Sequence, residues 1–298
     1  IASMHPSSIV ALNLFGDYTA NFKALMDARL AIKHRAFAAA GKMFDGKLKP
    51  YLKEETADAL SYALKIAINT VYGLTSAHFD NPFRDLRNKD NIVAKRGALF
   101  MMVLKEFVES LGFQVVHIKT DSIKIPNATE EIIEEVTSFG RQYGYEFENE
   151  GTYDKFCLTN DAVYIARKGD HWYAVGAQFQ HPYVFKTLFS KEQLEFEDYC
   201  ELRSVVKGAM YLDFDGEMHF VGRSGSFVPV EEPHGGILYR VNEDKKYAVT
   251  GTKGYRWVES IMFAADKDIP IDMRYFNKLT EKAIKAIEDF GSFEEFAG

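Results

Sequence analysis

The sequence of 298 residues contains few cysteines and no long apolar run. Its two cysteines, Cys157 and Cys200, argue against a disulfide framework and favour a reducing compartment, so we expect a cytoplasmic protein. No stretch approaches the roughly 18 consecutive apolar residues of a membrane-spanning helix, and no signal-peptide pattern is present. We therefore expect no association with a membrane.

The sequence also lacks the excess of basic residues that is typical of nucleic-acid-binding proteins, because its net charge is −7. The charge is unevenly distributed, however. Residues 18–53 hold eight Lys or Arg and two acidic residues, whereas residues 128–150 hold seven Glu and one Arg. A local basic surface can bind a polyanion whatever the net charge, because salt screens electrostatic fields beyond roughly 10 Å. On charge alone, solvated helix faces are the simpler interpretation of both segments.

The composition is that of an ordered globular protein, since 47% of the residues are apolar and 14% are aromatic. The order of the expected elements predicts an α+β fold rather than alternating βαβ units. Helices are expected over residues 18–44, 53–72, 90–111, 128–142, 254–266 and 272–290. Strands are expected over residues 145–149, 155–159, 162–168 and 171–177, and in several short runs after residue 200. The composition changes near residue 200, where we place a domain boundary.

The stretch VVHIKTDSIKI, residues 115–125, predicts a buried hairpin. Alternating apolar residues indicate two short strands, and Thr120, Asp121 and Ser122 lie at the bend. An ionised aspartate in a buried hairpin costs free energy unless another group neutralises its charge. Asp121 is therefore a candidate ligand or catalytic residue.

The first two long helices should form a helical hairpin, and each carries polar residues on one face. Lys65, Asn69 and Tyr72 stand at i, i+4 and i+7 in the second helix. A cation, an amide and a ring in one stripe would suit a phosphate, a sugar and a base. Arg29 and Lys33 share a face of the first helix and could converge on the same polyphosphate. A lysine lying over a packed tyrosine, and surface ion pairing of Arg29 and Lys33, remain as alternatives.

Three motifs stand in order along the chain. The first motif is IASMHPSSI from Ile1, the second is KIAINTVYG from Lys65, and the third is HIKTDS from His117. They resemble the D-x-x-S-L-Y-P-S, K-x-x-x-N-S-x-Y-G and Y-x-D-T-D-S motifs of family B DNA polymerases. Arg29 and Lys33 match the R-x-x-x-K pattern of the same family. The resemblance covers about residues 1–190, and segments such as GAQFQHPYVFKTLF are similar to bacteriophage members.

The resemblance implies a right-hand architecture for the α+β fold. The palm, an antiparallel sheet with helices, would comprise residues 1–17 and 74–199. The fingers helical hairpin would comprise residues 18–73, and a mixed thumb or thumb-like domain residues 200–298. The implied activity is DNA-directed DNA polymerisation, in which dNMP is transferred from a dNTP to a primer 3′-hydroxyl in DNA replication. Primer–template DNA and dNTPs would be the partners, and the host bacterial cytoplasm the location.

The resemblance also assigns roles to individual residues. Two Mg²⁺ ions, with Mn²⁺ as a substitute, would be held by the carboxylate of Asp121, the catalytic residue, and by the backbone carbonyl of Ile1. The incoming nucleotide would be bound by residues of the first two motifs and the basic helix: Ser3, Met4, His5, Arg29, Lys33, Lys65, Asn69 and Tyr72. Ser3 and Met4 would act through their backbone. The primer and its DNA would be contacted by Lys119, Thr120, Ser122 and Tyr164.

The sequence departs from the family pattern at several of these positions. Lys119 replaces the first aspartate of D-T-D, which contributes less directly to metal binding in the family. His5 replaces the tyrosine that blocks a ribose 2′-hydroxyl in the family, so the residue that the family uses for sugar discrimination differs here. Ala162 stands where the lysine of a K-x-Y motif would precede Tyr164.

The largest departure concerns the catalytic aspartate of the first motif, which should immediately precede Ile1. Its absence from the sequence, with that of an exonuclease domain, supports an alternative. The chain could be a catalytically incomplete fragment that binds primer–template DNA and needs a separate N-terminal segment or chain. That partner would supply the aspartate and the exonuclease.

Other candidates have simpler explanations. Asp213 and Asp215 resemble a metal-binding pair, but Asp-Gly before a strand is typical of a hairpin turn. Lys253, Tyr255 and Arg256, at the start of an expected helix, could either contact DNA or pack internally. The histidines after residue 170 show no ligand spacing.

Overall fold

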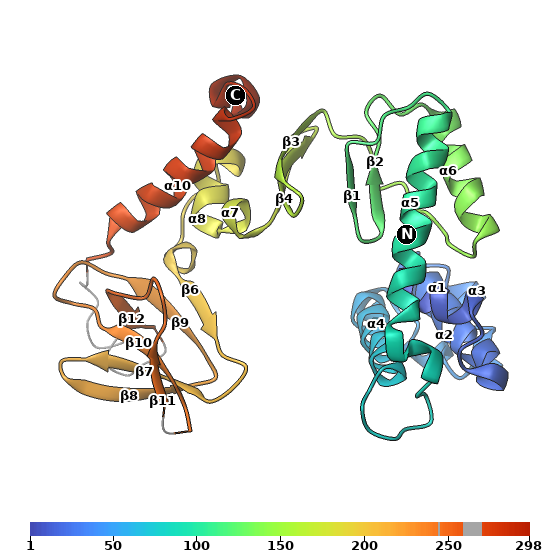
Figure 1. Ribbon diagram of the computed structural model, residues 1–298, viewed down its shortest axis with the longest axis horizontal. Coiled ribbons are helices and arrows are strands. Elements are labelled where there is room, and N and C mark those ends of the chain that lie inside the picture. Colours follow the sequence, from blue (N-terminus) through green and yellow to red (C-terminus); the bar gives the residue numbers. More distant parts are fainter. Residues whose placement is uncertain (244, 259–269) are drawn as a thin grey trace. The chain divides into compact units, whose positions relative to one another are not determined.

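The computed structural model describes residues 1–243, 245–258 and 270–298, with the backbone alone at residues 89 and 90. The chain forms two compact units, residues 1–150 and 151–298, which run from blue to green and from green to red in Figure 1. Both contain helices and antiparallel strands, so the α+β class is confirmed. The assignment of palm, fingers and thumb ranges stays a prediction. No helix within the described ranges is long and apolar enough to cross a membrane.

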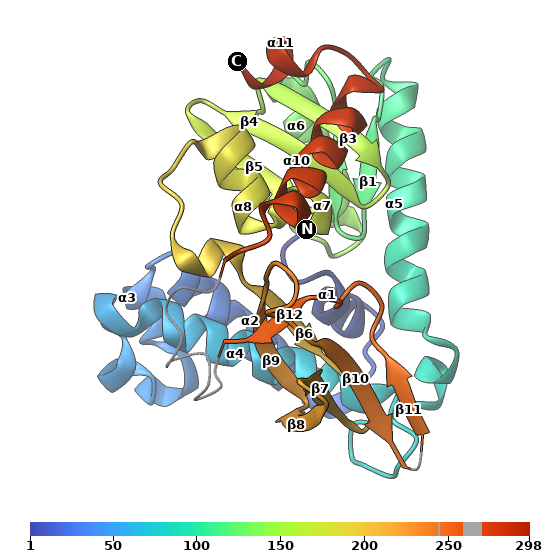
Figure 2. The same ribbon diagram turned by 90° about the vertical axis from the view of Figure 1, so that its left-hand side faces the viewer.

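The first unit is mainly helical. Its helices are α1 (Met4–Ala11), α2 (Thr19–Lys33), α3 (Phe37–Ala40), α4 (Glu54–Thr75), α5 (Ile92–Ser110) and α6 (Glu130–Gln142). Short 3-10 turns connect them: η1 (Gly16–Tyr18), η2 (Met43–Gly46), η3 (Lys49–Tyr51) and η4 (Leu86–Asp90). α2 packs against α4 through a buried cluster that includes Phe22, Met26 and Ile68, so the predicted helical hairpin is present. α5 is a long helix that Figure 2 shows in full.

Two helix boundaries differ from the prediction. The expected helix over residues 18–44 ends at Lys33, because Arg35 adopts a left-handed conformation with a φ of 59°. A helix cannot continue through that backbone geometry. The second helix, expected over residues 53–72, continues through Gly73 to Thr75.

A two-stranded hairpin, β1 (His117–Lys119) and β2 (Ser122–Lys124), follows α5 as predicted. Its apolar residues pack on α5 and α6 in a core that includes Phe100, Leu104, Ile132 and Tyr145. Thr129 caps α6 by accepting a hydrogen bond from the backbone N–H of Ile132. The expected strand over residues 145–149 is wrong, since no regular secondary structure is assigned to this segment.

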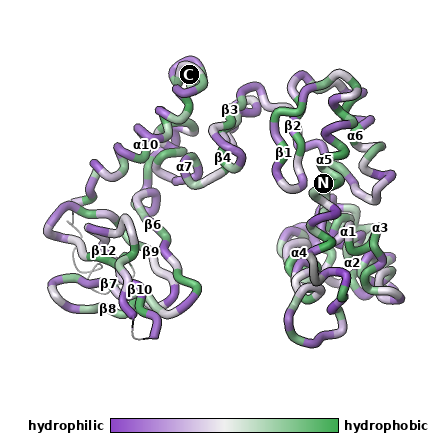
Figure 3. The backbone as a smooth tube through the Cα atoms, in the orientation of Figure 1, coloured by the Kyte–Doolittle hydropathy of each residue, from purple (hydrophilic) through white to green (hydrophobic). Residues whose placement is uncertain are grey.

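The second unit begins with a three-stranded antiparallel sheet, in the order β3 (Lys155–Asn160), β4 (Val163–Lys168) and β5 (His171–Val175). Helical segments pack against one face of it: α7 (Ala177–Gln180), α8 (Pro182–Phe185), η5 (Lys186–Ser190, a π-helix), α10 (Met273–Glu288) and α11 (Phe293–Ala297). Hydrophobic and hydrophilic residues alternate along α10 in Figure 3, as expected for a helix with one buried face.

Two more antiparallel sheets enclose a separate core that includes Met210, Leu238 and Tyr255. Their strands are β6 (Glu201–Ser204), β7 (Ala209–Phe214), β8 (Glu217–Gly222), β9 (Ser224–Pro229), β10 (Ile237–Asn242), β11 (Lys245–Ala248) and β12 (Tyr255–Trp257); η6 (Phe196–Tyr199) precedes them. The strand at 255–257 corrects the expected helix over 254–266, of which residues 259–266 lie outside the described ranges. The helix expected over 272–290 is α10.

Candidate functional site

The first residues of the chain lie beside the hairpin of the third motif. The backbone nitrogen of Ile1 donates a hydrogen bond to the backbone carbonyl of Asp121 at 2.5 Å. The next backbone N–H, of Ala2, donates to the carbonyl of Glu146 at 2.8 Å. Residues 1 and 2 therefore run between the hairpin and the segment that follows α6. The fold thus joins the first and third motifs, which are about 120 residues apart.

The hairpin turn presents Asp121. Lys119 pairs with Ser122 across the strands, which leaves Thr120 and Asp121 as the two turn residues. Thr120 has a φ of 50°, a conformation that β-branched residues rarely adopt and that costs about 1–3 kcal/mol. The half-buried carboxylate of Asp121 makes no hydrogen bond or ion pair with any described residue. It is therefore available to a ligand.

The basic helix α2 reaches the first motif through Arg29. Its guanidinium donates a hydrogen bond from Nη1 to Oγ of Ser3 at 2.9 Å. Ser3 itself has a left-handed backbone (φ 57°, ψ 54°) immediately before α1. Among the described residues, Nε of Arg29 and Nδ1 of His5 are buried polar atoms without a hydrogen-bond partner. Buried unpaired polar atoms of this kind call for a ligand or a water molecule.

Lys33, one helical turn after Arg29, contacts a residue that the sequence analysis did not single out. Its Nζ lies 2.7 Å from Oε2 of Glu148, and Nε2 of His34 lies 3.1 Å from Oε1 of the same carboxylate. The hydrogen bond from Lys33, with a smaller contribution from His34, lowers the pKa of Glu148 below its ordinary value. In the sequence, Glu148 is one of the seven glutamates of residues 128–150. The alternation in YEFENE, with apolar Tyr145 and Phe147, was the available signal for its orientation.

The second motif meets the first through two rings. The imidazole of His5 stacks on the ring of Tyr72, with centroids 4.7 Å apart and an angle of 9° between the planes. The hydroxyl of Tyr72 donates to Oδ1 of Asn91 at 3.3 Å, and burial raises the pKa of that phenol. Tyr72 is thus placed by neighbours on both sides, rather than lying loose on the helix surface.

The remaining predicted residues are less directly connected. Lys65 and Asn69 are exposed on α4, and no hydrogen bond or ion pair within the described part of the chain joins them to the other candidates. The side chain of Met4 is buried in the core against Gly97, so the predicted contact of a nucleotide with Met4 could involve only its backbone. Tyr164 belongs to β4 of the second unit, where its ring packs 5.0 Å from that of Phe156.

The weaker candidates of the sequence analysis have structural explanations. Asp215 and Gly216, both at positive φ, form the two-residue turn between β7 and β8, which confirms the turn interpretation. Tyr255 and Arg256 are buried, and Arg256 donates to the carbonyl of His234 at 3.0 Å. Internal packing is therefore the correct alternative for these two residues.

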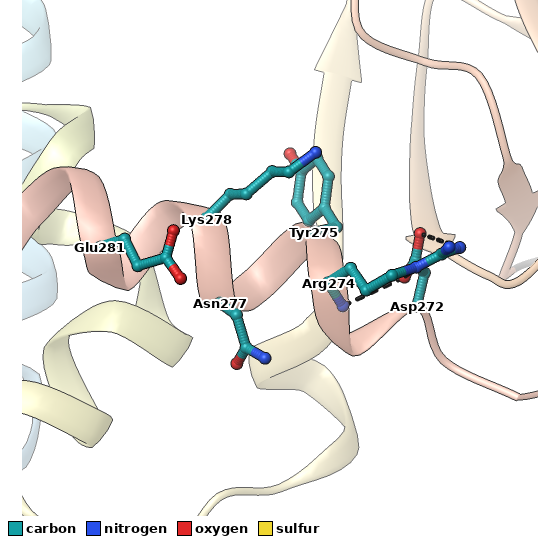
Figure 4. Close-up of a pocket in the computed structure, with 6 residues that line it drawn as sticks. All are labelled: Asp272, Arg274, Tyr275, Asn277, Lys278 and Glu281. Carbon is teal, nitrogen blue, oxygen red and sulfur yellow. Dashed lines mark hydrogen bonds and ion pairs between the residues drawn. The ribbon is translucent and has the colours of Figure 1, made fainter.

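A shallow pocket of about 520 Å³ lies beside the start of α10 (Figure 4). It is lined by Asp272, Arg274, Tyr275, Asn277, Lys278 and Glu281. Nε of Arg274 donates to Oδ1 of Asp272 at 2.9 Å, so its charge is already balanced. None of the residues predicted from the three motifs lines this pocket.

The donor set at the hairpin is incomplete for a centre of two magnesium ions. Mg²⁺ prefers oxygen ligands in octahedral geometry, commonly with carboxylates. Asp121 offers one carboxylate, and Lys33 and His34 already engage Glu148. Within the described ranges, no group of three or more His, Cys, Asp or Glu residues could hold a metal ion. Asp121 fits the role of a single ligand, and further carboxylates would have to join it.

The fold is similar to that of the family B DNA polymerase from the hyperthermophilic archaeon Pyrobaculum calidifontis. The match covers 92% of this chain and 38% of that polymerase, with 15% sequence identity and a TM-score of 0.45. The chain thus spans well under half the length of that protein. No protein-family model matches the sequence, and no curated protein does. This likeness concerns the backbone fold, and no role of a single residue rests on it.

Proposed function

We propose that this chain is the polymerase portion of a family B DNA polymerase and adds dNMP from dNTPs to a primer 3′-hydroxyl. One observation carries the proposal: segments far apart in the sequence, each matching a motif of that family, meet in one place. Ile1 bonds to the backbone of Asp121, Arg29 to Ser3, and the ring of His5 stacks on that of Tyr72. Bacteriophage origin and a place in the host cytoplasm belong to the same proposal.

The basic helix would bind the triphosphate of the nucleotide. Arg29 presents a rigid fork of donors, one of which is buried and unpaired, and such forks match phosphate oxygens. Lys33 adds a point charge one turn away on the same face of α2. Lys65 and Asn69 would extend the contact along α4. The paired rings of His5 and Tyr72 provide an apolar surface against which a sugar or base can lie.

Asp121 would hold a magnesium ion, with the Ile1 carbonyl as a second oxygen ligand. When bound, such ions stabilise the charge that develops during nucleotidyl transfer. The strained turn at Thr120 keeps the Asp121 carboxylate at the end of the hairpin, where Lys119, Thr120 and Ser122 would contact the primer. Because no group of three or more metal-ligating side chains forms within the described ranges, further carboxylates would come from an additional segment.

The shortage of carboxylates favours a second candidate function. In this alternative the chain binds primer–template DNA but is catalytically incomplete, and a separate N-terminal segment completes the metal site. Lys119 next to Asp121 supports it, because a cation at this position would bind the DNA backbone rather than a metal ion.

Primer extension with Mg²⁺ tests both candidates. The chain would be assayed alone and then with an added N-terminal segment that ends in aspartate. Extension by the chain alone supports the polymerase and rules out the need for a partner. Primer extension that occurs only after the N-terminal segment is added supports the alternative, in which the chain is a catalytically incomplete fragment.

A variant pair tests the role of Asp121. Asp121→Asn should abolish primer extension in whichever preparation extends the primer, the chain alone or the chain with the added segment. Asp215→Asn, which alters a hairpin turn outside the site, should leave primer extension unchanged. Full activity of Asp121→Asn would refute the assignment of Asp121.

A further inference from the structure

Glu148 engages the lysine that the proposed function assigns to the triphosphate. Its Oε2 lies 2.7 Å from Nζ of Lys33, and its Oε1 lies 3.1 Å from Nε2 of His34. Both oxygens therefore interact with the end of α2. The contact joins residues about 115 positions apart, so the fold and not the local sequence creates it.

We propose that Glu148 is a resident anion that occupies Lys33 until a triphosphate displaces it, and that it thereby sets the affinity for the nucleotide. The inference rests on the proposed function in one respect, namely that Lys33 binds phosphate. A lysine ammonium is a compact point charge, so a carboxylate and a phosphate compete for it directly.

The exposure of the pair permits such an exchange. The side chain of Lys33 is 42% exposed and that of Glu148 is 35% exposed. Partly exposed ion pairs contribute little to stability, because water and salt screen them. An incoming triphosphate can therefore replace Glu148 at a small cost.

The surroundings of the pair point to an anion as the replacement. Arg29 precedes Lys33 by one turn on the same helix face and keeps a buried, unpaired Nε. His34 adds a third basic side chain that Glu148 currently engages. Once the triphosphate has displaced the carboxylate of Glu148, Arg29 and Lys33 of α2 and the adjoining His34 would all be able to contact the triphosphate.

A direct binding experiment distinguishes competition from support. Inorganic tripolyphosphate and dATP would each be titrated into the whole chain, without primer, at low salt. If Glu148 competes, Glu148→Gln binds both ligands about two- to fivefold more tightly, the range expected for an exposed ion pair. The gain should shrink as salt is added, because salt screens the competing charge.

Two further variants control the experiment. Glu146→Gln alters a neighbouring exposed glutamate that pairs with Arg141, and it should bind both ligands as the wild type does. In a Lys33→Ala background, Glu148→Gln should not increase the affinity for either ligand, because the lysine for which carboxylate and phosphate compete is no longer present. Thermal unfolding of each variant would verify that it is folded.

The inference is overturned if Glu148→Gln binds tripolyphosphate as the wild type does or more weakly, or if the gain persists without Lys33. The inference is also overturned if neither the wild type nor Glu148→Gln binds tripolyphosphate. The experiments distinguish failure of this inference from failure of the proposed function. Tighter tripolyphosphate binding without any primer extension, even with an added segment, would support the inference and refute the polymerase. Primer extension with unchanged triphosphate binding would overturn the inference alone.

Discussion

The rings of His5 and Tyr72 lie parallel, 4.7 Å apart, although one belongs to α1 and the other to α4. This stack holds the first motif against the second, and the bond from Tyr72 to Asn91 anchors it from the other side. Flat aromatic surfaces of this kind suit stacking with bases. The relationship has consequences for stability and for substrate choice.

Removal of one ring of the stack should destabilise the first unit. A stacked pair contributes about 0.5–1.5 kcal/mol beyond the area that it buries. We expect His5→Ala to lower the melting temperature by about 1–5 °C, as measured by circular dichroism. Tyr72→Phe, which keeps the ring and loses the bond to Asn91, should have a smaller effect. Wild-type melting of His5→Ala would show that the stack contributes nothing.

His5 should also affect discrimination between sugars. The tyrosine that stands at this position in family B polymerases is larger than histidine and would reach further toward a ribose 2′-hydroxyl. We expect His5→Tyr to increase the preference for dATP over ATP about tenfold, which corresponds to about 1.4 kcal/mol. The preference is measured by letting dATP and ATP compete for insertion of a single nucleotide, in the preparation that extends the primer. An unchanged ratio would mean that His5 does not face the sugar.

The turn at Thr120 should be more stable with a residue that tolerates a left-handed backbone. Thr120 has a φ of 50°, which asparagine adopts far more readily than a β-branched residue does. We expect Thr120→Asn to stabilise the first unit by up to about 1 kcal/mol. Thr120→Val, which stays β-branched, is the matched control and should bring no gain. Urea unfolding measures both, and equal stabilities of the two variants would contradict strain at this turn.

A buried network in the second unit should make stability depend on pH. One oxygen of Glu201 lies 3.1 Å from Nε2 of His181 and accepts a hydrogen bond from the hydroxyl of Tyr275 at 2.5 Å. Burial alone would raise the pKa of Glu201, but these hydrogen bonds and the charge of Arg203 lower it below its ordinary value. Burial, together with the same hydrogen bond, raises the pKa of Tyr275.

The sign of the pH effect follows from the lowered pKa. Glu201 stabilises the fold at pH values above the ordinary glutamate pKa of about 4.3, and this contribution is lost as the pH falls through the lower folded-state pKa. We expect Glu201→Gln to cost about 3 kcal/mol at pH 7, because it leaves buried partners unpaired. The difference from the wild type should shrink toward pH 3. Glu217→Gln, at an exposed position, is the control, and a pH-independent difference would contradict the network.

Short-range features of this protein follow from its sequence alone. The hairpin at residues 117–124 is visible in the alternation of apolar residues, because side chains on a strand alternate between its two faces. The common face of Arg29 and Lys33 follows from the helical period. The turn at Asp215 follows from the left-handed conformation that Asp-Gly tolerates.

Other features depended on contacts between distant segments. The break of the first long helix at Arg35, and the strand at residues 255–257, replaced helices that local propensity favoured. The pairing of Glu148 with Lys33 and the bond from Ile1 to Asp121 have no local signal at all. Periodicity shows which face of an element is buried, but not which segment covers it. The sequence therefore determined the candidate residues and their local geometry, and only tertiary packing decided which of them meet and that Glu148 lies among them.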